Sequence, residues 1–281
     1  MAGRRAGQGE RRARASGRRA EARACPLAAI ATLDSASVNV DAVFFDFGGT
    51  LFSYRGVQGR SFYPILLESL ERLGVDAEPG DAGRAWRRAS AEAYREHHPL
   101  DYYLHKDLFV DTFRRFALHV GGEASPADLE WYYETQRRMV VEGFALRPGC
   151  VEMLGRLRGA GLHVGIVSNI DDDYLLPMLQ RAELGSHLDA WTSSEEARSC
   201  KPHAGIYEHA LRKAGAVAER TVFVGDSPEH DIVGARRLGM RTVLIREDEV
   251  ETPGAGAGEA AAPHHTVREL PEVAEWVLAT G

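Results

Sequence analysis

Four short polar segments hold the side chains of this chain that could do chemistry. They are Asp46 with Gly48-Gly49-Thr50, the pair Ser168-Asn169, the pair Lys201-Pro202, and the run from Gly225 to Asp231 that contains Asp226. A carboxylate directly after a buried strand is a nucleophile-type group, and a nearby lysine or hydroxyl could hold an anion beside it. Taken singly, Asp46 could instead cap a strand, Ser168-Asn169 a helix, and Asp226-Ser227-Pro228 could form a plain turn.

The elements that would position these segments follow a strand-then-helix rhythm. Apolar runs predict strands at 42–45, 163–167, 221–224 and 241–245, with a weaker one at 188–192, and amphipathic periodicity predicts helices at 151–160, 206–214 and 232–238. This rhythm is typical of a parallel sheet that is covered by helices on both faces. Asp46, Ser168 and Asp226 each end a predicted strand, where open parallel sheets place their ligand sites. Lys201-Pro202 is expected to open a helix, with proline at its first position.

Between the first and second strands the rhythm changes to helices alone. Helical periodicity recurs at 62–73, 84–97, 104–120 and 126–142, over about 90 residues, which is far longer than an ordinary connection. We therefore predict three parts: a disordered Arg-rich tail (1–37), an α/β core (38–54 and 146–281) and a helical cap domain (55–145). The Gly/Ala/Pro-rich segment 251–262 reads as a loop before a last helix at 270–278.

Charge and cysteine content narrow the partners and the compartment. Residues 1–24 hold eight Arg and two Glu, although the whole chain has a net charge of −7, so the body is acidic and a nucleic-acid partner is not expected. The three cysteines form no C-x-x-C pair, which fits a reducing compartment. No apolar run is long enough to span a membrane. We expect a cytoplasmic protein without a membrane partner. A homodimer is compatible with this composition.

The four segments, in this order and with helices between the first two, resemble the haloacid dehalogenase (HAD) superfamily of aspartate-nucleophile hydrolases. The resemblance extends from about Val38 to Trp276. It implies a doubly wound, mostly parallel α/β core that is similar to a Rossmann fold, with an inserted helical cap that closes over the site. It also implies a Mg²⁺-dependent hydrolase, in the first place a phosphatase that acts on a small phosphorylated metabolite.

The same resemblance assigns a role to each segment. Asp46 would form an aspartyl-phosphate and also hold the metal, together with the backbone carbonyl of Gly48, Asp226 and Asp231, an all-oxygen set that suits Mg²⁺. The phosphate would be bound by Gly49, Thr50, Ser168, Asn169 and Lys201, and Ser168 and Lys201 would assist catalysis. Lys201 is one of only three lysines among 34 Lys and Arg residues, and a compact ammonium differs from a guanidinium in such a site.

Gly48 departs from the family pattern, because most phosphatases of the superfamily have there a second Asp that protonates the leaving group. Three interpretations stay open. The protein could be a phosphatase whose leaving group is a weak base or whose cap supplies the proton, with Tyr54, His105 and Lys106 as candidates. It could cleave carbon–halogen bonds, or carbon–phosphorus bonds through a Schiff base at Lys106. It could also be a weakly catalytic member that binds a phosphate or a partner.

Aromatic and histidine residues of the cap give weaker signals. The pairs Tyr102-Tyr103 and Tyr132-Tyr133, with Trp86 and Trp131, are expected mainly to pack between cap helices. The pair His97-His98 lacks a third metal ligand, and we expect it at the surface.

Overall fold

The computed structural model describes residues 39–53, 62–246 and 262–280. The chain separates into two units, Met1–Ala36 and Ser37–Gly281, and every described residue lies in the second unit. The expected tail, Tyr54 and nearly all of the loop at 251–262 therefore fall outside the described residues.

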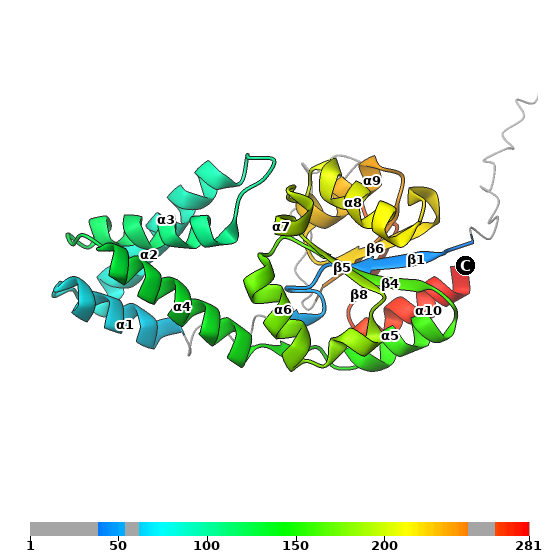
Figure 1. The fold of residues 1–281 in the computed structure, drawn as a ribbon, viewed down its shortest axis with the longest axis horizontal. Coiled ribbons are helices and arrows are strands. Elements are labelled where there is room, and N and C mark those ends of the chain that lie inside the picture. Colours follow the sequence, from blue (N-terminus) through cyan, green and yellow to red (C-terminus); the bar gives the residue numbers. More distant parts are fainter. Residues whose placement is uncertain (1–38, 54–61, 247–261, 281) are drawn as a thin grey trace, which may run out of the picture. The chain divides into compact units, whose positions relative to one another are not determined.

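The main sheet has six strands, all parallel, in the order β5-β4-β1-β6-β7-β8 (Figure 1). The strands are β1 (Ala42–Phe45), β4 (His163–Ser168), β5 (Ala190–Ser193), β6 (Thr221–Gly225), β7 (Arg241–Ile245) and β8 (His265–Val267). The chain starts at the centre with β1, adds β4 and β5 on one side, and then adds β6, β7 and β8 on the other. This doubly wound order confirms the predicted α/β fold.

Helices cover both faces of the sheet, and β1 shows how the sequence determines this. All four of its side chains are buried; Val43 and Phe45 pack into one hydrophobic core, whereas Ala42 and Phe44 pack into another. The first core includes α5 (Cys150–Gly159), α6 (Asp172–Arg181) and α10 (Leu270–Thr280), and the second includes α8 (Ala204–Ala214) and α9 (Gly234–Arg237). A strand that is buried on both faces is apolar throughout, which is why its sequence does not alternate.

A helical insertion leaves the core through β2 (Phe52–Ser53) and returns through β3 (Ala145–Leu146), and these two short strands pair antiparallel. Its helices are α1 (Phe62–Leu73), α2 (Pro79–His97), α3 (His105–His119) and α4 (Pro126–Gly143). They enclose a core of their own, in which Phe113 and Tyr132 stack with ring centroids 4.4 Å apart and Trp86 contacts Tyr132. The expected aromatic packing is thus confirmed for Trp86, Trp131 and Tyr132, whereas Tyr102 lies beside Arg198 and Tyr133 contacts Tyr174 in α6. The division into a core domain and a cap domain stays a prediction.

Three local differences from the expected elements concern helix starts. α2 begins at Pro79 rather than at 84, because proline is compatible with the first turn. The helix expected at 232–238 is instead a π-helical turn, Pro228–Val233, followed by α9. Lys201-Pro202 does not open a helix: α8 begins at Ala204, and the Lys201–Pro202 peptide bond is cis.

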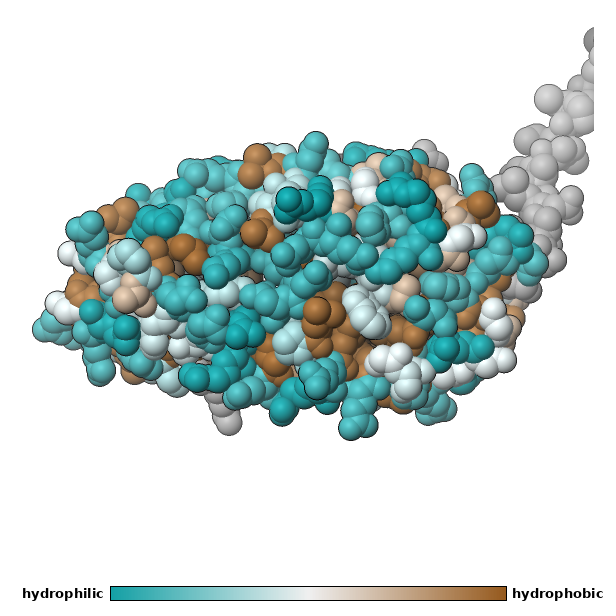
Figure 2. Space-filling model, viewed as in Figure 1, coloured by the Kyte–Doolittle hydropathy of each residue, from teal (hydrophilic) through white to brown (hydrophobic). Residues whose placement is uncertain are grey.

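Short connecting elements complete the described chain. They are the 3₁₀ turns at Leu184–His187 and Ala218–Arg220 and the helix α7 (Ser194–Ala197). None of the helices in the described ranges combines the length and the apolar character that crossing a lipid bilayer requires. The face shown in Figure 2 is mostly hydrophilic, with hydrophobic residues scattered among the polar ones.

Candidate active site

The topology brings three of the sequence-predicted residues to one edge of the sheet. Asp46 follows β1, Ser168 ends β4, and Asp226 follows β6, and β4 and β6 are the two neighbours of β1. Phe45 pairs with Ile166 on one side and with Val224 on the other, so the three strands end at nearly the same level. The meeting of these side chains is therefore a direct result of strand order and register.

Lys201 connects two buried carboxylates at this edge. Its Nζ lies 2.6 Å from Asp46 Oδ1 and 2.7 Å from Asp231 Oδ1, and its side chain is 2% exposed. Although burial alone would lower the pKa of Lys201, the charges of Asp231 and Asp46 raise it above its usual value. The ammonium therefore stays charged at neutral pH and holds Asp46 in place.

The side chain of Asn169 fixes the backbone of Lys201. Its Oδ1 accepts a hydrogen bond from the Lys201 N–H at 2.6 Å, and its Nδ2 donates to the Lys201 carbonyl at 2.9 Å. Both backbone groups of Lys201 are thus bonded to the loop that follows β4. This arrangement positions the lysine without a helix, which explains why the expected helix start at Pro202 is wrong.

Two hydroxyl groups complete the surroundings of Asp46. Ser168 Oγ donates to Asp46 Oδ1 at 2.9 Å, and Thr50 Oγ1 lies 3.3 Å from both Asp46 Oδ2 and Asp226 Oδ1. Asp46 is buried, with 6% exposure, so these contacts and Lys201 compensate its charge away from bulk water.

The carboxylates of Asp46, Asp226 and Asp231 offer oxygen atoms within 4.8 Å of one another, close enough to hold one cation. Although Asp226 is exposed at this edge, desolvation of its carboxyl and the charges of Asp46 and Asp231 raise its pKa to about 7. Burial also raises the pKa of Asp231, against the effect of Lys201. One lysine does not balance three carboxylates, and a hard divalent ion such as Mg²⁺ fits this donor set.

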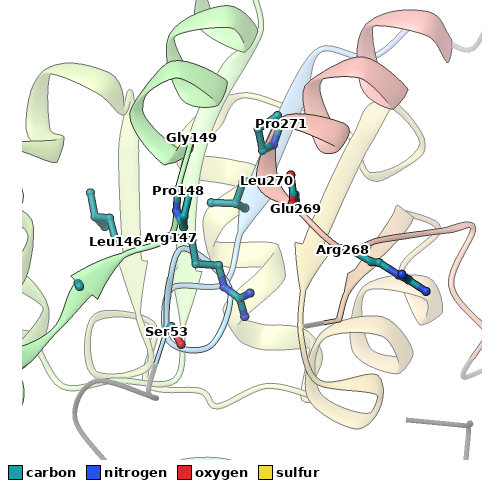
Figure 3. A pocket seen from close by; sticks show the side chains of 10 residues that line it. Ser53, Leu146, Arg147, Pro148, Gly149, Arg268, Glu269, Leu270 and Pro271 are labelled. Atoms are coloured by element: carbon teal, nitrogen blue, oxygen red, sulfur yellow. The ribbon is translucent and has the colours of Figure 1, made fainter. Parts of the chain in front are cut away.

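Glycines make room for these carboxylates. Gly49 has φ +84°, and a Cβ atom there would lie 2.3 Å from Asp226 Oδ2; a Cβ at Gly225 would lie 2.2 Å from Asp231 Oδ2. The carbonyl of Gly49 accepts a hydrogen bond from the Arg147 guanidinium, whose position is visible in Figure 3. Gly48 takes part in a bridge to Phe52, so the loop after Asp46 has a defined backbone conformation.

These residues line a cavity of about 240 Å³. Core and insertion both contribute to it: the lining residues are Asp46, Gly48, Ser168, Asn169, Lys201, Asp226, Ser227, His230 and Asp231 with Tyr94, Tyr103 and His105. Of the residues expected to act here, Gly49 and Thr50 are not among the lining residues, although Thr50 Oγ1 contacts Asp226 Oδ1.

The candidates for a replacement acid separate clearly. His105 lines the cavity, whereas Lys106 lies over the Tyr133 ring at 4.6 Å and 4.0 Å from Glu130 Oε2, with 43% of its side chain exposed. Tyr54 lies outside the described residues. The structure thus brings His105 to the site and directs Lys106 elsewhere.

Sequence reasoning missed several residues at the junction of the insertion and the core. His98 is not at the free surface as expected: its Nε2 lies 2.5 Å from His230 Nε2, and His230 Nδ1 lies 3.2 Å from Ser227 Oγ. Asp171 is buried at the start of α6 and binds the first turn of α3. Periodicity within the insertion could not reveal these partners, because they lie on another part of the chain.

A larger cavity of about 480 Å³ lies between β3, the start of α5 and the start of α10 (Figure 3). Its lining includes Leu146, Arg147, Arg268 and Leu270, but none of the residues that the sequence assigned to catalysis or metal binding. The carboxylates and the lysine identify the smaller cavity as the candidate active site.

Comparison with known proteins gives a consistent result. The family model of haloacid dehalogenase-like hydrolases matches residues 40–239. A glyceraldehyde 3-phosphate phosphatase from Methanothermobacter thermautotrophicus is 32% identical over 75% of this chain and 87% of that protein. A ribulose-1,5-bisphosphate 5-phosphatase from Halopiger xanaduensis is 27% identical over 84% of this chain and 98% of that protein.

Further similarities extend to a different reaction and to solved structures. An (S)-2-haloacid dehalogenase from Pseudomonas putida is 26% identical over 85% of this chain and 97% of that protein. The fold matches the magnesium-bound HAD-hydrolase YfnB from Bacillus subtilis with a TM-score of 0.67 and 18% identity, over 85% of this chain and 99% of that one.

Proposed function

Because the chain belongs to the haloacid dehalogenase-like hydrolases, we propose that it is a Mg²⁺-dependent phosphatase that acts on a small phosphorylated metabolite through an aspartyl-phosphate at Asp46. The observation that carries this proposal is the cluster of Asp46, Asp226 and Asp231 around one lysine. The phosphatases among the relatives support the same substrate class. The cavity volume of about 240 Å³ suits a small substrate.

Each residue of the site has its own role in the proposed reaction. Lys201 and Ser168 hold Asp46 Oδ1, which leaves Oδ2 of that carboxylate directed toward Thr50 and available for attack. Asp46, Asp226, Asp231 and the carbonyl of Gly48 would hold Mg²⁺, which would supply positive charge to offset the negative charges of the nucleophile and the phosphoryl group. Lys201 and the hydroxyl of Ser168, with Asn169, Gly49 and Thr50 around them, then orient the phosphoryl group for attack in line.

The carbon–halogen alternative is supported less well by the charges of the site. Displacement of a halide by a carboxylate needs no divalent cation, so this reaction would give no role to the cluster of Asp46, Asp226 and Asp231. The carbon–phosphorus alternative needs a lysine amine beside the substrate. Lys106 contacts Tyr133 and Glu130 instead, and the raised pKa of Lys201 keeps it protonated.

Hydrolysis of p-nitrophenyl phosphate with and without Mg²⁺ tests the proposal, with Asp46→Asn as the matched variant. We expect hydrolysis that requires the metal and is lost in Asp46→Asn, and a rise in thermal stability with Mg²⁺ and beryllium fluoride, which imitates the phosphoryl group on an aspartate. Activity that survives Asp46→Asn, or halide release from 2-chloropropionate in place of phosphate release, would contradict it.

A further inference from the structure

We propose that His105, oriented by Asp171, is the acid that protonates the leaving group. It would replace the second aspartate of the family, whose position is occupied by Gly48 in this chain. This inference rests on the proposed phosphatase function and adds a catalytic residue from the helical insertion. It is carried by three observations: a contact that fixes the start of α3, the direction of the His105 ring, and the engagement of the other candidates elsewhere.

Asp171 attaches the first turn of α3 to the core. Its carboxylate accepts hydrogen bonds from the backbone N–H of His105 at 2.9 Å and of Lys106 at 2.7 Å, and the residue is 2% exposed. Asp171 lies only three positions after Ser168, which contacts the nucleophile. The backbone of His105 is thus fixed relative to Asp46 through one short loop of the core.

The same carboxylate faces the imidazole. Asp171 Oδ1 lies 3.6 Å from Nδ1 of His105, whose side chain is 15% exposed and whose ring packs beside Tyr103, with centroids 5.0 Å apart. Because Nδ1 is buried against Asp171, Nε2 is the nitrogen left to face the cavity that His105 lines. Although burial alone would raise the pKa of Asp171, hydrogen bonds from His105 and Lys106 lower it, so Asp171 places a carboxylate charge beside the imidazole.

Further titratable groups share this cavity and set its charge. Tyr103 lies against the imidazole, and the other groups line the cavity beside it: Lys201, Asp46, Asp226, Asp231, His230 and Tyr94. With a divalent cation bound, the charges of the three carboxylates and the one lysine would be balanced, so Asp171 is the carboxylate that sets the charge beside His105.

The other candidates are engaged differently. Both nitrogens of His230 have partners, Ser227 Oγ and His98 Nε2. Burial raises the pKa of Tyr103 far above its usual value, which makes its phenol a poor proton donor. Lys106 does not line the cavity. His105 combines access, orientation and a suitable acid group.

The reaction balances with this residue alone as the proton carrier. Asp46 attacks phosphorus, the bond to the leaving oxygen breaks, and that oxygen takes the proton from Nε2 of the imidazolium. The neutral imidazole then takes a proton from water as the water oxygen attacks phosphorus. The bond between phosphorus and Asp46 breaks, inorganic phosphate leaves, and both the carboxylate and the imidazolium are restored.

Two substrates of similar size separate an acid from a binding residue. p-Nitrophenyl phosphate has a leaving group that needs no proton, whereas benzyl phosphate releases a strongly basic alkoxide. In His105→Gln we expect kcat/KM, which reports only the steps up to release of the leaving group, to fall by about 10²–10⁴ for benzyl phosphate and to stay within a few-fold for p-nitrophenyl phosphate. Lys106→Gln, the neighbouring position outside the cavity, serves as control and should leave both rates unchanged.

The outcomes distinguish this inference from the function on which it rests. Equal losses of kcat/KM on both substrates, no loss of kcat/KM on either, or a wild-type protein that cleaves only p-nitrophenyl phosphate would each overturn the role of His105 as the acid. Absence of any hydrolysis that requires Asp46 would instead overturn the proposed function.

Two further variants probe the mechanism of proton transfer. Asp171→Asn removes the negative charge that faces the imidazole, so the decline of benzyl phosphate hydrolysis at alkaline pH should move to lower pH, a change that a merely structural role would not cause. Adding Gly48→Asp to His105→Gln places a carboxyl group two residues beyond the nucleophile and should restore part of the benzyl phosphate activity. An unmoved profile together with no restoration would contradict the proposed proton transfer.

Discussion

At the scale of single residues, the surroundings of Asp46 hold its carboxylate in a fixed position, as its proposed role as nucleophile requires. Lys201 and Ser168 both contact Oδ1, and the lysine also contacts Asp231. Removal of one partner from such a buried group would leave a charge without compensation, which typically costs about 3–5 kcal/mol of stability. The lysine therefore contributes both to folding and to the proposed chemistry.

The requirement for a lysine at position 201 can be tested directly. In Lys201→Arg the planar guanidinium cannot occupy a space in which the ammonium meets two carboxylates at 2.6 and 2.7 Å. We expect kcat/KM for p-nitrophenyl phosphate to fall by about 10²–10³. Lys213→Arg is the matched control, because Lys213 is partly exposed and binds Glu196 and the Trp191 carbonyl. Similar activities of the two variants would contradict a specific role of the Lys201 ammonium.

Much of this residue-level site could be predicted, but not all of it. Asp46, Ser168 and Asp226 were predictable because each ends a strongly apolar strand, and parallel strands end at one edge. His105 could be named only as one of three candidates from the cap. The proximity of Tyr94 and Asp171 was not predictable, since helical periodicity shows which residues share a helix face and not what that face meets. His98 shows the same limit, because its partner His230 lies more than a hundred residues away.

At the scale of elements, the turn after β1 depends on a glycine for two reasons. Gly49 adopts a left-handed φ of +84°, and any Cβ there would overlap the carboxylate of Asp226. The β1–β2 connection therefore limits the volume around the proposed metal ligands.

A second glycine with the same φ angle allows the effect of the left-handed backbone to be separated from the effect of crowding against Asp226. Gly121 also has φ +84°, but a Cβ there would meet nothing within 4 Å. We expect Gly121→Ala to lose about 1–2 kcal/mol of stability from the left-handed backbone alone, with activity retained. Gly49→Ala should lose more stability and also most of its activity, as measured by chemical denaturation and phosphatase assay. Equal effects of the two substitutions would show that the crowding against Asp226 is unimportant.

The boundaries of strands were predictable where the segment was long enough and strongly apolar. The strands at β1 and β7 match their expected ranges, and β4 and β6 extend them by one residue. β2 and β3 have two residues each, too few for any periodicity. β8 begins at His265, within a polar sequence, and its pairing with β7 is a tertiary effect.

At the scale of the whole molecule, the carboxylate cluster links folding to pH and to the proposed metal binding. The folded protein raises the pKa of Asp226 to about 7, above the usual carboxyl value. Between these two values the folded state holds a proton that the unfolded state releases, so the free energy of unfolding without metal falls as the pH rises through this window. A cation that binds the deprotonated cluster has the opposite effect.

Thermal unfolding with and without Mg²⁺ measures this linkage. We expect stabilisation by Mg²⁺ to be larger at about pH 8 than at about pH 5, and to reach about 2.7 kcal/mol when the ion is present at about 100 times its Kd. Asp226→Asn should weaken the response to Mg²⁺ and flatten the pH dependence of the metal-free protein. A response that is equal at both pH values, or unchanged in the variant, would contradict a shared metal site.

The hydrogen bonds between Asn169 and Lys201 have a consequence for anyone who wishes to transplant this site into another scaffold. The side-chain amide of Asn169 forms hydrogen bonds with both the N–H and the carbonyl of Lys201. These two bonds therefore depend on the position of the main chain and not on the lysine side chain. A designer could exchange the lysine without disturbing this junction, but could not move the lysine without moving the end of β4 with it. The two loops are one transferable module, although 31 positions of sequence separate their ends.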